Sequence, residues 1–250
     1  MHADYDKNYN GTSVNGTSVN DVRPIVQSVH AYNNVKVHAC IDSVGNIFTK
    51  NSSLLTCSLF NSRSIKNKMP DLHQFIYNNA APKILFITET WLNHTISDAM
   101  IDPMSHYTIY RCDRTHRNGG GVLTLIDKTI RTVRHELSVN FPNVEGILIE
   151  FEKRVKFRIL LIYRPPDHNI ELMQEICNCI VSKCSDGCTT LVVGDFNCGK
   201  IDWINSLVMS DNEQLLFCDT VNDLCLYQFV DLYTRGESIL LYIVLGTVVS

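Results

Sequence analysis

Hydrophobic and polar residues follow different patterns in two parts of the chain. Residues 1–50 are rich in Asn and Ser, contain the tandem repeat Asn-Gly-Thr-Ser-Val at residues 10–19, and show no sustained hydrophobic period. Such a segment buries too little apolar surface to offset the entropy lost on ordering. We therefore predict a disordered low-complexity tail over residues 1–50, with a short strand at residues 35–41 as the alternative, and a folded domain over residues 51–250.

From residue 54 onward the pattern predicts alternating strands and helices. Short apolar runs bounded by turn residues predict strands, and apolar residues repeated every three or four positions predict helices. Strands are expected at residues 54–60, 83–88, 107–111, 121–126, 130–137, 144–151, 155–163, 189–193 and 239–245. Helices are expected at residues 64–78, 169–184 and 211–226, and Pro70 should separate a short first piece from the first of them. Many strands with a few helices between them favour an α/β fold of two packed sheets flanked by helices.

Composition narrows the class of protein. The 45% hydrophobic and 19% charged residues are typical of a globular domain, and a formal net charge of −4 excludes a global positive field for nucleic acid. The ten cysteines include no C-x-x-C pair, and several fall at apolar positions, which favours reduced thiols and an intracellular location. The N-terminus shows no signal-peptide pattern, and the apolar run at residues 239–249 is too short to span a membrane, so we expect no membrane association.

Polar residues that suit metal and phosphate chemistry stand where predicted strands end. These residues are Asn61, Glu89, Tyr163, Asp195 and Asn197. Strand ends are rigid and can bring polar groups to one rim of the sheets, and carboxylate and amide oxygens are ligands that Mg²⁺ accepts. An Asp and an Asn two residues apart on an extended segment face the same side, so one could activate a water that the other orients. Each residue alone is better explained as an ordinary turn or strand exit, and only the combination favours a site.

The combination, in this order, resembles a known family. Residues 60–68 (FNSRSIKNK), 87–92 (ITETWL), 119–122 (GGGV), 162–166 (IYRPP) and 194–197 (GDFN) are similar to motifs of the endonuclease/exonuclease/phosphatase superfamily. The first two segments are most similar to the apurinic-like endonuclease of non-LTR (LINE-type) retrotransposons. The resemblance covers residues 54–250.

The resemblance implies a four-layer α/β sandwich that cleaves a DNA phosphodiester with Mg²⁺, or with Mn²⁺ as an alternative metal. By position, Glu89 would bind the metal with Asn61 beside it, and Tyr163 would contact the scissile phosphate. Asp195 would position or deprotonate the attacking water, and Asn197 would help to hold the phosphate and that water. In the retrotransposon family the nick primes reverse transcription, which implies DNA as the partner, a monomer without a small-molecule cofactor, and a nuclear location.

A basic stretch precedes the triple glycine at residues 119–121. Arg111, Arg114 and Arg117, together with Arg63 from the earlier motif, are candidates for contacts with DNA phosphates. A solvated charged turn explains the same residues equally well. The triple glycine precedes a predicted strand instead of joining a strand to a helix, so it is not a P-loop.

Two features of the family are missing. Residues 234–240 resemble a segment that continues into a strand carrying an aspartate, but Leu241 follows here, and leucine binds neither a metal nor a proton. The family domain then ends with a Ser-Asp-His motif, which the sequence does not reach before Ser250; His168 is the one histidine considered as a substitute. Acid–base help of this kind contributes about 10²–10⁴-fold to a rate. We therefore expect a C-terminally truncated or decayed copy, with its last strands incomplete and with strongly reduced or no nuclease activity.

Three functions remain open. The first is a Mg²⁺-dependent DNA endonuclease, and the second is a catalytically inactive remnant or nucleic-acid-binding module that keeps Asn61 and Glu89. The third is a lipid or sugar phosphatase of the same superfamily. The missing Ser-Asp-His motif favours the second function over the first, and the NSRSI and TETWL segments argue against the third.

Overall fold

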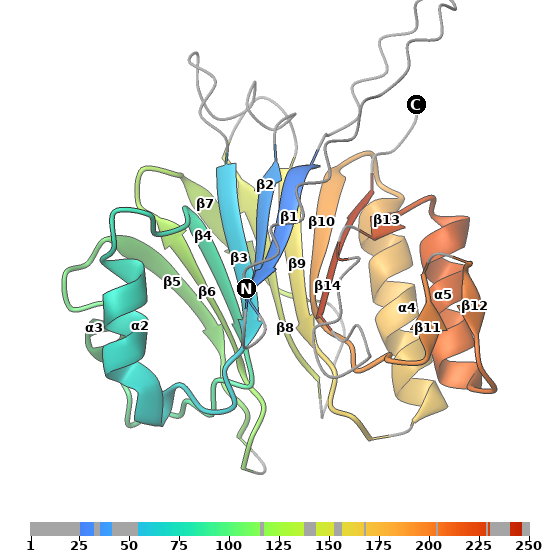
Figure 1. Cartoon of the computed structure of the whole chain (residues 1–250), viewed down its shortest axis with the longest axis horizontal. Helices are drawn as coiled ribbons and strands as arrows, with labels where there is room; N and C mark the ends of the chain where they lie inside the picture. The colour runs from blue at the N-terminus through green and yellow to red at the C-terminus, as the bar shows by residue number, and fades with distance from the viewer. Residues whose placement is uncertain are drawn as a thin grey trace, which may run out of the picture.

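The computed structural model describes residues 26–32, 36–41, 55–115, 118–137, 144–152, 157–167, 169–203, 205–228, 230 and 241–246. Two mixed six-stranded sheets pack face to face (Figure 1). In spatial order, the first sheet contains β1 (Val26–Tyr32), β2 (Lys36–Ile41), β3 (Leu55–Asn61), β4 (Ile84–Thr88), β6 (Val122–Asp127) and β5 (Tyr107–Cys112). The second contains β13 (Tyr227–Gln228), β14 (Leu241–Gly246), β10 (Thr189–Asp195), β9 (Phe157–Tyr163), β8 (Glu145–Phe151) and β7 (Thr132–His135).

Helices cover the outer face of each sheet. The 3₁₀ turn η1 (Lys66–Lys68), α2 (Met69–Ile76) and α3 (Asp98–Ile101) lie beside the first sheet. The longer helices α4 (Ile170–Cys184) and α5 (Asn212–Asp223) lie beside the second, next to the small pair β11 (Ile201–Asp202) and β12 (Leu207–Val208). The predicted four-layer α/β sandwich is therefore confirmed.

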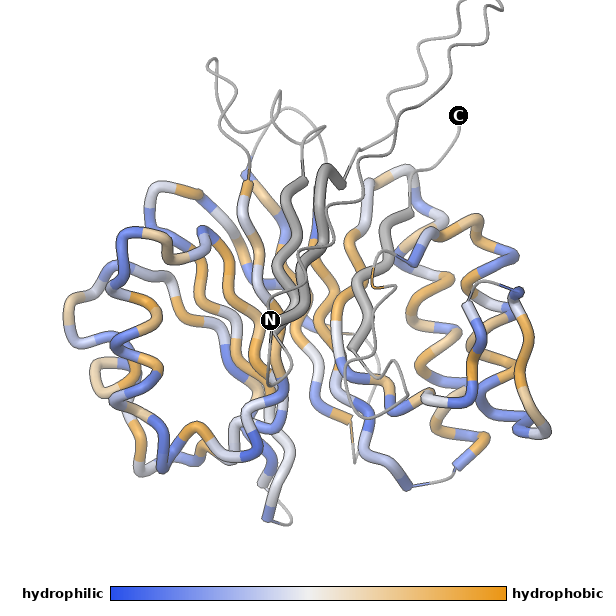
Figure 2. The backbone as a smooth tube through the Cα atoms, in the orientation of Figure 1, coloured by the Kyte–Doolittle hydropathy of each residue, from blue (hydrophilic) through white to orange (hydrophobic). Residues whose placement is uncertain are grey.

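The alternation of side chains along the strands divides the core into three layers. In β4, Ile84 and Phe86 belong to the cluster between the two sheets, whereas Leu85 and Ile87 pack in the cluster under α2, because successive side chains of a strand point to opposite faces. A third cluster fills the space between the second sheet and α4 and α5. Hydrophobic residues accordingly run along the central strands in Figure 2, as expected for strands covered on both faces.

Each sheet contains one parallel strand pair joined by a helix. In the first sheet β3 pairs with β4 across α2, with Asn61 opposite Thr88, and in the second β9 pairs with β10 across α4, with Tyr163 opposite Asp195. Strands of a parallel pair end at the same edge of their sheet, so the residues that follow them lie close together. On its other side β10 pairs with β14, which places Leu241 opposite Asp195.

Most expected elements are present within a few residues of their predicted bounds. The separate first turn before Pro70 is confirmed as η1, and the last expected strand is present as β14, so β10 is paired on both sides and is not an open edge. The expectation of a disordered tail is wrong for residues 26–32 and 36–41, where β1 and β2 extend the first sheet, and the alternative of a strand near residues 35–41 matches β2. The repeat at residues 10–19 lies outside the described residues, and the domain boundary at residue 50 stays a prediction.

Nine of the ten cysteines are free thiols, and most of these nine are buried. Burial raises the pKa of Cys177 to about 11 and that of Cys184 to about 12, so both thiols stay protonated near neutral pH. In the part of the chain that the structure describes, no helix has the length and apolar character of a membrane span.

Candidate active site

The five polar residues predicted from the sequence meet at one rim of the sandwich. Asn61 and Tyr163 are the last residues of β3 and β9, Glu89 follows β4 directly, and Asp195 is the last residue of β10. The amide nitrogen of Asn61 donates to Glu89 Oε1 at 2.6 Å and to Asp195 Oδ2 at 2.8 Å. One atom of the first sheet thus binds carboxylates from both sheets, so the two carboxylates converge.

Tyr163 lies next to this carboxylate pair. Its side chain is buried, and its pKa is raised, first by burial and then by the negative charges of Glu89 and Asp195, whereas Arg114 opposes the shift. The phenol therefore stays protonated near neutral pH, and it can act as a hydrogen-bond donor. That donor would suit an anionic group brought to the carboxylates by a metal ion.

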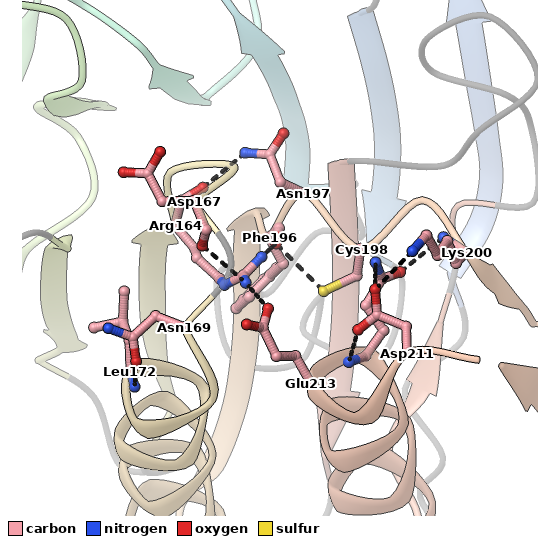
Figure 3. Close-up of polar contacts among 11 residues, drawn as sticks. Arg164, Asp167, Asn169, Leu172, Phe196, Asn197, Cys198, Lys200, Asp211 and Glu213 are labelled. Atoms are coloured by element: carbon pink, nitrogen blue, oxygen red, sulfur yellow. Dashed lines mark hydrogen bonds and ion pairs between the residues drawn. The ribbon is translucent and has the colours of Figure 1, made fainter. Parts of the chain in front are cut away.

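Asn197 holds the loop after β10. Its amide nitrogen donates to the carbonyl oxygen of Arg164 at 2.7 Å, as Figure 3 shows, and its backbone N–H donates to Asp195 Oδ1 at 3.2 Å. It also adopts a φ of 53°, a left-handed conformation that Asn tolerates better than most residues. In this arrangement Asn197 orients the carboxylate of Asp195, and its own contact with a phosphate or water stays a prediction.

Positive φ angles cluster around the site. Five of the nine non-glycine residues with positive φ in the described part of the chain belong to the loops after β3, β4 and β10: Arg63, Ser64, Glu89, Trp91 and Asn197. Such conformations persist only where surrounding contacts enforce them, and they are typical of functional sites. Here backbone hydrogen bonds enforce them, because Ser64 N–H donates to the carbonyl of Glu89 at 2.8 Å and Trp91 N–H to that of Gly120 at 3.0 Å.

A buried ion pair beside Tyr163 was not predicted from the sequence. Arg114 Nε and Nη2 donate to the two carboxylate oxygens of Glu145 at 2.6 and 3.0 Å, and the backbone N–H of Gly121 donates to the same carboxylate at 3.2 Å. The guanidinium carbon of Arg114 lies 5.6 Å from the centre of the Tyr163 ring. A Cβ at Gly120 would come within 2.4 Å of that guanidinium, so this position of the triple glycine has no room for a side chain.

A second buried ion pair lies under the loop after β10. Arg164 is 1% exposed, pairs with Glu213 of α5, and donates from Nη1 to the carbonyl of Phe196 at 3.1 Å (Figure 3). Its backbone N–H donates to the carbonyl of Asp195 at 2.9 Å. The Arg of the IYRPP segment therefore fixes the segment that carries Asp195 and Asn197. Sequence reasoning assigned it no role, because its partner is 49 residues away.

The glycine of the GDFN segment is required by the close approach of β9 and β10. A Cβ at Gly194 would lie 1.8 Å from the carbonyl oxygen of Ile162, a distance that no rotation of a side chain could relieve. The absence of a side chain thus lets the two parallel strands end together, with Tyr163 opposite Asp195.

The four arginines predicted to contact DNA lie in different surroundings. Arg111 pairs with Asp113 and Asp98 and donates to the carbonyls of Ile96 and Asn93, so its guanidinium holds a loop together and lends no support to a role in phosphate binding. Arg114 lies in the site but binds Glu145. Arg63 is exposed, and Arg117 lies outside the described residues. His168, which was considered as a substitute for the missing histidine, also lies outside them.

The carboxylates of Glu89 and Asp195 and the amide oxygen of Asn61 are ligands of the kind that Mg²⁺ accepts. Mg²⁺ takes hard oxygen ligands, commonly one or two protein carboxylates completed by water and phosphate. Glu89 and Asp195 already share one hydrogen-bond donor, and rotation of the Asn61 amide would replace that donor with an oxygen. No cluster of three His, Cys, Asp or Glu side chains that could hold a metal occurs among the described residues.

Comparisons with known proteins bear on the fold. No family model matches the sequence, and no curated protein matches it. The structure is similar to a 3′–5′ exonuclease from Neisseria meningitidis, with 15% identity, a TM-score of 0.55, and coverage of 76% of this chain and 86% of that one. It is also similar to the endonuclease domain of TRAS1, a telomere-specific non-LTR retrotransposon (16% identity, TM-score 0.53, coverage 76% and 83%). An AP endonuclease from Leishmania major matches similarly (13% identity, TM-score 0.56, coverage 76% and 78%). At these identities the likeness shows the fold shared with such nucleases.

Proposed function

We propose that the chain is a Mg²⁺-dependent phosphodiesterase that nicks DNA slowly, an endonuclease domain of the non-LTR retrotransposon type. The observation that carries this proposal is the convergence of the Glu89 and Asp195 carboxylates, one from each sheet, on the amide of Asn61 beside the protonated phenol of Tyr163. The sequence motifs that bring these residues to the strand ends and the fold shared with nucleases support the same function.

Each residue has a role in the proposed hydrolysis. Glu89 and Asn61 would hold the Mg²⁺ ion, which when bound stabilises negative charge on the phosphate and the leaving oxygen. Asp195, oriented by the backbone N–H of Asn197, would accept a proton from the attacking water. Tyr163 would donate a hydrogen bond to a phosphate oxygen, because its phenol stays protonated beside two carboxylates.

The pairing of β14 with β10 is the reason to expect slow hydrolysis. Leu241 stands opposite Asp195, at the position where the family resemblance expects an aspartate. A leucine offers no acid–base group, and such groups contribute about 10²–10⁴-fold to catalysis. The same observation favours a second candidate function, a module that binds nucleic acid and does not cleave it.

Nicking of supercoiled plasmid by the purified chain tests the proposal. We expect slow conversion to the open circle in Mg²⁺, none in EDTA, and none with Asp195→Ala. Asp219→Ala is the matched control, because Asp219 is an exposed carboxylate on the outer helix α5. Circular dichroism would confirm that all variants are folded.

The outcomes separate the two candidate functions. Nicking that requires both Mg²⁺ and Asp195, and that Asp219→Ala leaves intact, would support the enzyme. A folded protein that binds DNA without nicking it in Mg²⁺ would contradict hydrolysis and establish the binding module. Nicking that persists in Asp195→Ala would show a contaminating nuclease or a different site.

A further inference from the structure

Trp91 is held in an unusual position two residues after Glu89. Its side chain is 45% exposed, and its φ is 55°, a backbone conformation that bulky residues rarely adopt. Two backbone hydrogen bonds hold it there, from Trp91 N–H to the carbonyl of Gly120 at 3.0 Å and from Thr90 N–H to that of Gly121 at 3.2 Å. A tryptophan that only filled the core would be buried, so this geometry presents the indole at the surface.

The indole lines a groove of about 780 Å³ with polar and cationic side chains. Lys66 and Asn67 of the turn after β3 line it, together with His94, Arg114 and Asn118, and with Asp113, whose carboxylate pairs with Arg111. The volume falls within the range of about 300–1,000 Å³ that is usual for sites of small ligands. An aromatic face combined with cations and amides is the lining expected for nucleic acid, because bases stack on aromatic rings while cations attract the phosphates.

The groove adjoins the candidate active site through Arg114. Arg114 lines the groove, and its guanidinium carbon lies 5.6 Å from the centre of the Tyr163 ring. Trp91 is joined to Glu89 by Thr90 alone, and the backbone N–H of Ile65, next to the groove residue Lys66, donates to the carbonyl of Thr90 at 2.9 Å. A strand with its phosphate at Glu89 and Asp195 would therefore continue into the groove.

We infer that this groove binds an unpaired nucleotide of the DNA strand, next to the scissile phosphate, with its base stacked on Trp91. An unpaired nucleotide is required because the faces of bases inside a duplex are covered by their neighbours. Lys66 is placed for the flanking phosphate, and the amides of Asn67 and Asn118 offer hydrogen-bonding groups to the edges of the base. The inference rests on the proposed function for the class of ligand, but it concerns binding and not hydrolysis.

Tryptophan fluorescence gives a direct test, because the chain contains two tryptophans. Trp203 packs edge-on against Phe217, with ring centres 6.3 Å apart, in the core under α4 and α5. The full chain would be titrated in EDTA with a short single-stranded DNA, and separately with the same strand annealed to its complement as a blunt duplex without a loop. We expect the single strand to quench the emission, Trp203→Phe to preserve that quenching, and Trp91→Phe to abolish it.

Affinity measured by anisotropy of a labelled oligonucleotide provides the second readout. Trp91→Ala should weaken single-strand binding about 5- to 150-fold, the effect of losing one base–aromatic stack. Lys66→Ala, at an exposed position, should weaken binding and reduce its salt dependence by about one ion, which tests the groove without changing the indole. Circular dichroism would show whether each variant is folded.

Three outcomes would overturn the inference. One is equal quenching by the duplex, another is quenching that survives in Trp91→Phe, and the third is unchanged affinity in both Trp91→Ala and Lys66→Ala. Failure of the proposed hydrolysis is distinguishable, because these titrations contain no Mg²⁺: quenching by single-stranded DNA without plasmid nicking contradicts only the enzyme, and nicking without Trp91-dependent binding contradicts only the groove.

Discussion

The two halves of the sandwich use different kinds of contact to fix the loops at their shared rim. In each half, two parallel strands joined by a helix end with polar residues at the shared rim: Asn61 and Glu89 in the first sheet, Tyr163 and Asp195 in the second. The first half fixes its loops mainly through backbone hydrogen bonds, in which Ser62, Ser64 and Ile65 donate to the carbonyls of residues 88–90. The second half fixes its loops mainly through one side chain, Arg164, and its partner Glu213.

This difference predicts which substitutions should lower the stability of each half. A backbone network tolerates changes of most side chains but depends on glycines at which a Cβ would be strained or crowded. A buried side-chain pair depends on two residues, because removal of one leaves the other charged and without its partner in the interior. The halves should therefore respond to different variants, and the three predictions below run from the largest expected effect to the smallest.

The largest effect is expected from Arg164→Met. This change leaves the buried carboxylate of Glu213, on α5, without the guanidinium of Arg164. It also removes the donor to the carbonyl of Phe196. Breaking a buried ion pair in this way should lower the free energy of unfolding by about 3–5 kcal/mol. Urea denaturation at pH 7 would measure the change.

Two variants test whether the burial of the pair is the cause. Lys83→Met breaks the pair between Lys83 and Asp127, whose side chains are 48% and 24% exposed, and should cost less than about 1 kcal/mol. Arg164→Met combined with Glu213→Leu should recover most of the lost stability, because no buried charge remains. Equal losses for Lys83→Met and Arg164→Met would remove the distinction between the two halves.

The sequence predicted the positions of the site residues better than the contacts that hold them. Asn61, Glu89, Tyr163 and Asp195 stand at the ends of apolar runs, and a strand end is a local property that the hydrophobic pattern reveals. Glu145 and Glu213 stand inside ordinary segments of the sequence, and they matter only because folding places Arg114 and Arg164 beside them. Long-range ion pairs leave no local signal, so the pattern could not identify them.

The short elements and the strand β1 were missed, and β2 was expected only as an alternative, for a related reason. Two-residue strands such as Ile201–Asp202 have no detectable period, and α3, of four residues, is equally short. β1 and β2 lie in a polar segment whose composition favours disorder. β2 pairs with β3, and β1 pairs with β2, so the sheet supplies hydrogen bonds that the isolated segment lacks. Tertiary pairing therefore outweighed local propensity there.

A smaller effect is expected from Gly121→Ala in the first half. Gly121 has a φ of 83°, and a Cβ there would lie 2.6 Å from Thr90 Oγ1. The left-handed conformation alone costs about 1–2 kcal/mol for alanine, and the crowding against Thr90 adds to it. Gly187→Ala is the matched control, because Gly187 has a φ of 81° but no atom within 4 Å of its Cβ position.

The difference between these two glycines measures what the backbone network contributes. If Gly121→Ala lowers the melting temperature more than Gly187→Ala, the carbonyl of Gly121 and the turn around it hold Thr90 in place. We also expect Gly121→Ala to weaken single-strand binding at Trp91, because a displacement of Thr90 would shift Trp91, the next residue in the chain. An equal change in melting temperature for both variants would mean that only the φ angle matters, and that the first half is not fixed in the way described.

The smallest effect on stability is expected from Asn61→Ala, at the point where the two halves meet. Its amide nitrogen is the donor shared by Glu89 and Asp195, and without it the two carboxylates repel each other. We expect a loss of about 1 kcal/mol at pH 7. Asn178→Ala, which removes an exposed hydrogen bond with Gln174 on α4, is the matched control and should cost less.

Mg²⁺ sharpens this last test. Because Asn61 is a proposed ligand of the ion, added Mg²⁺ should raise the melting temperature of Asn61→Ala by less than that of the parent chain. Glu89→Gln removes one of the two charges and should abolish most of the stabilisation by Mg²⁺ in either background. If Mg²⁺ stabilised Glu89→Gln as strongly as the parent, the ion would bind elsewhere, and the meeting point of the two halves would be a hydrogen-bonded contact without a role in metal binding.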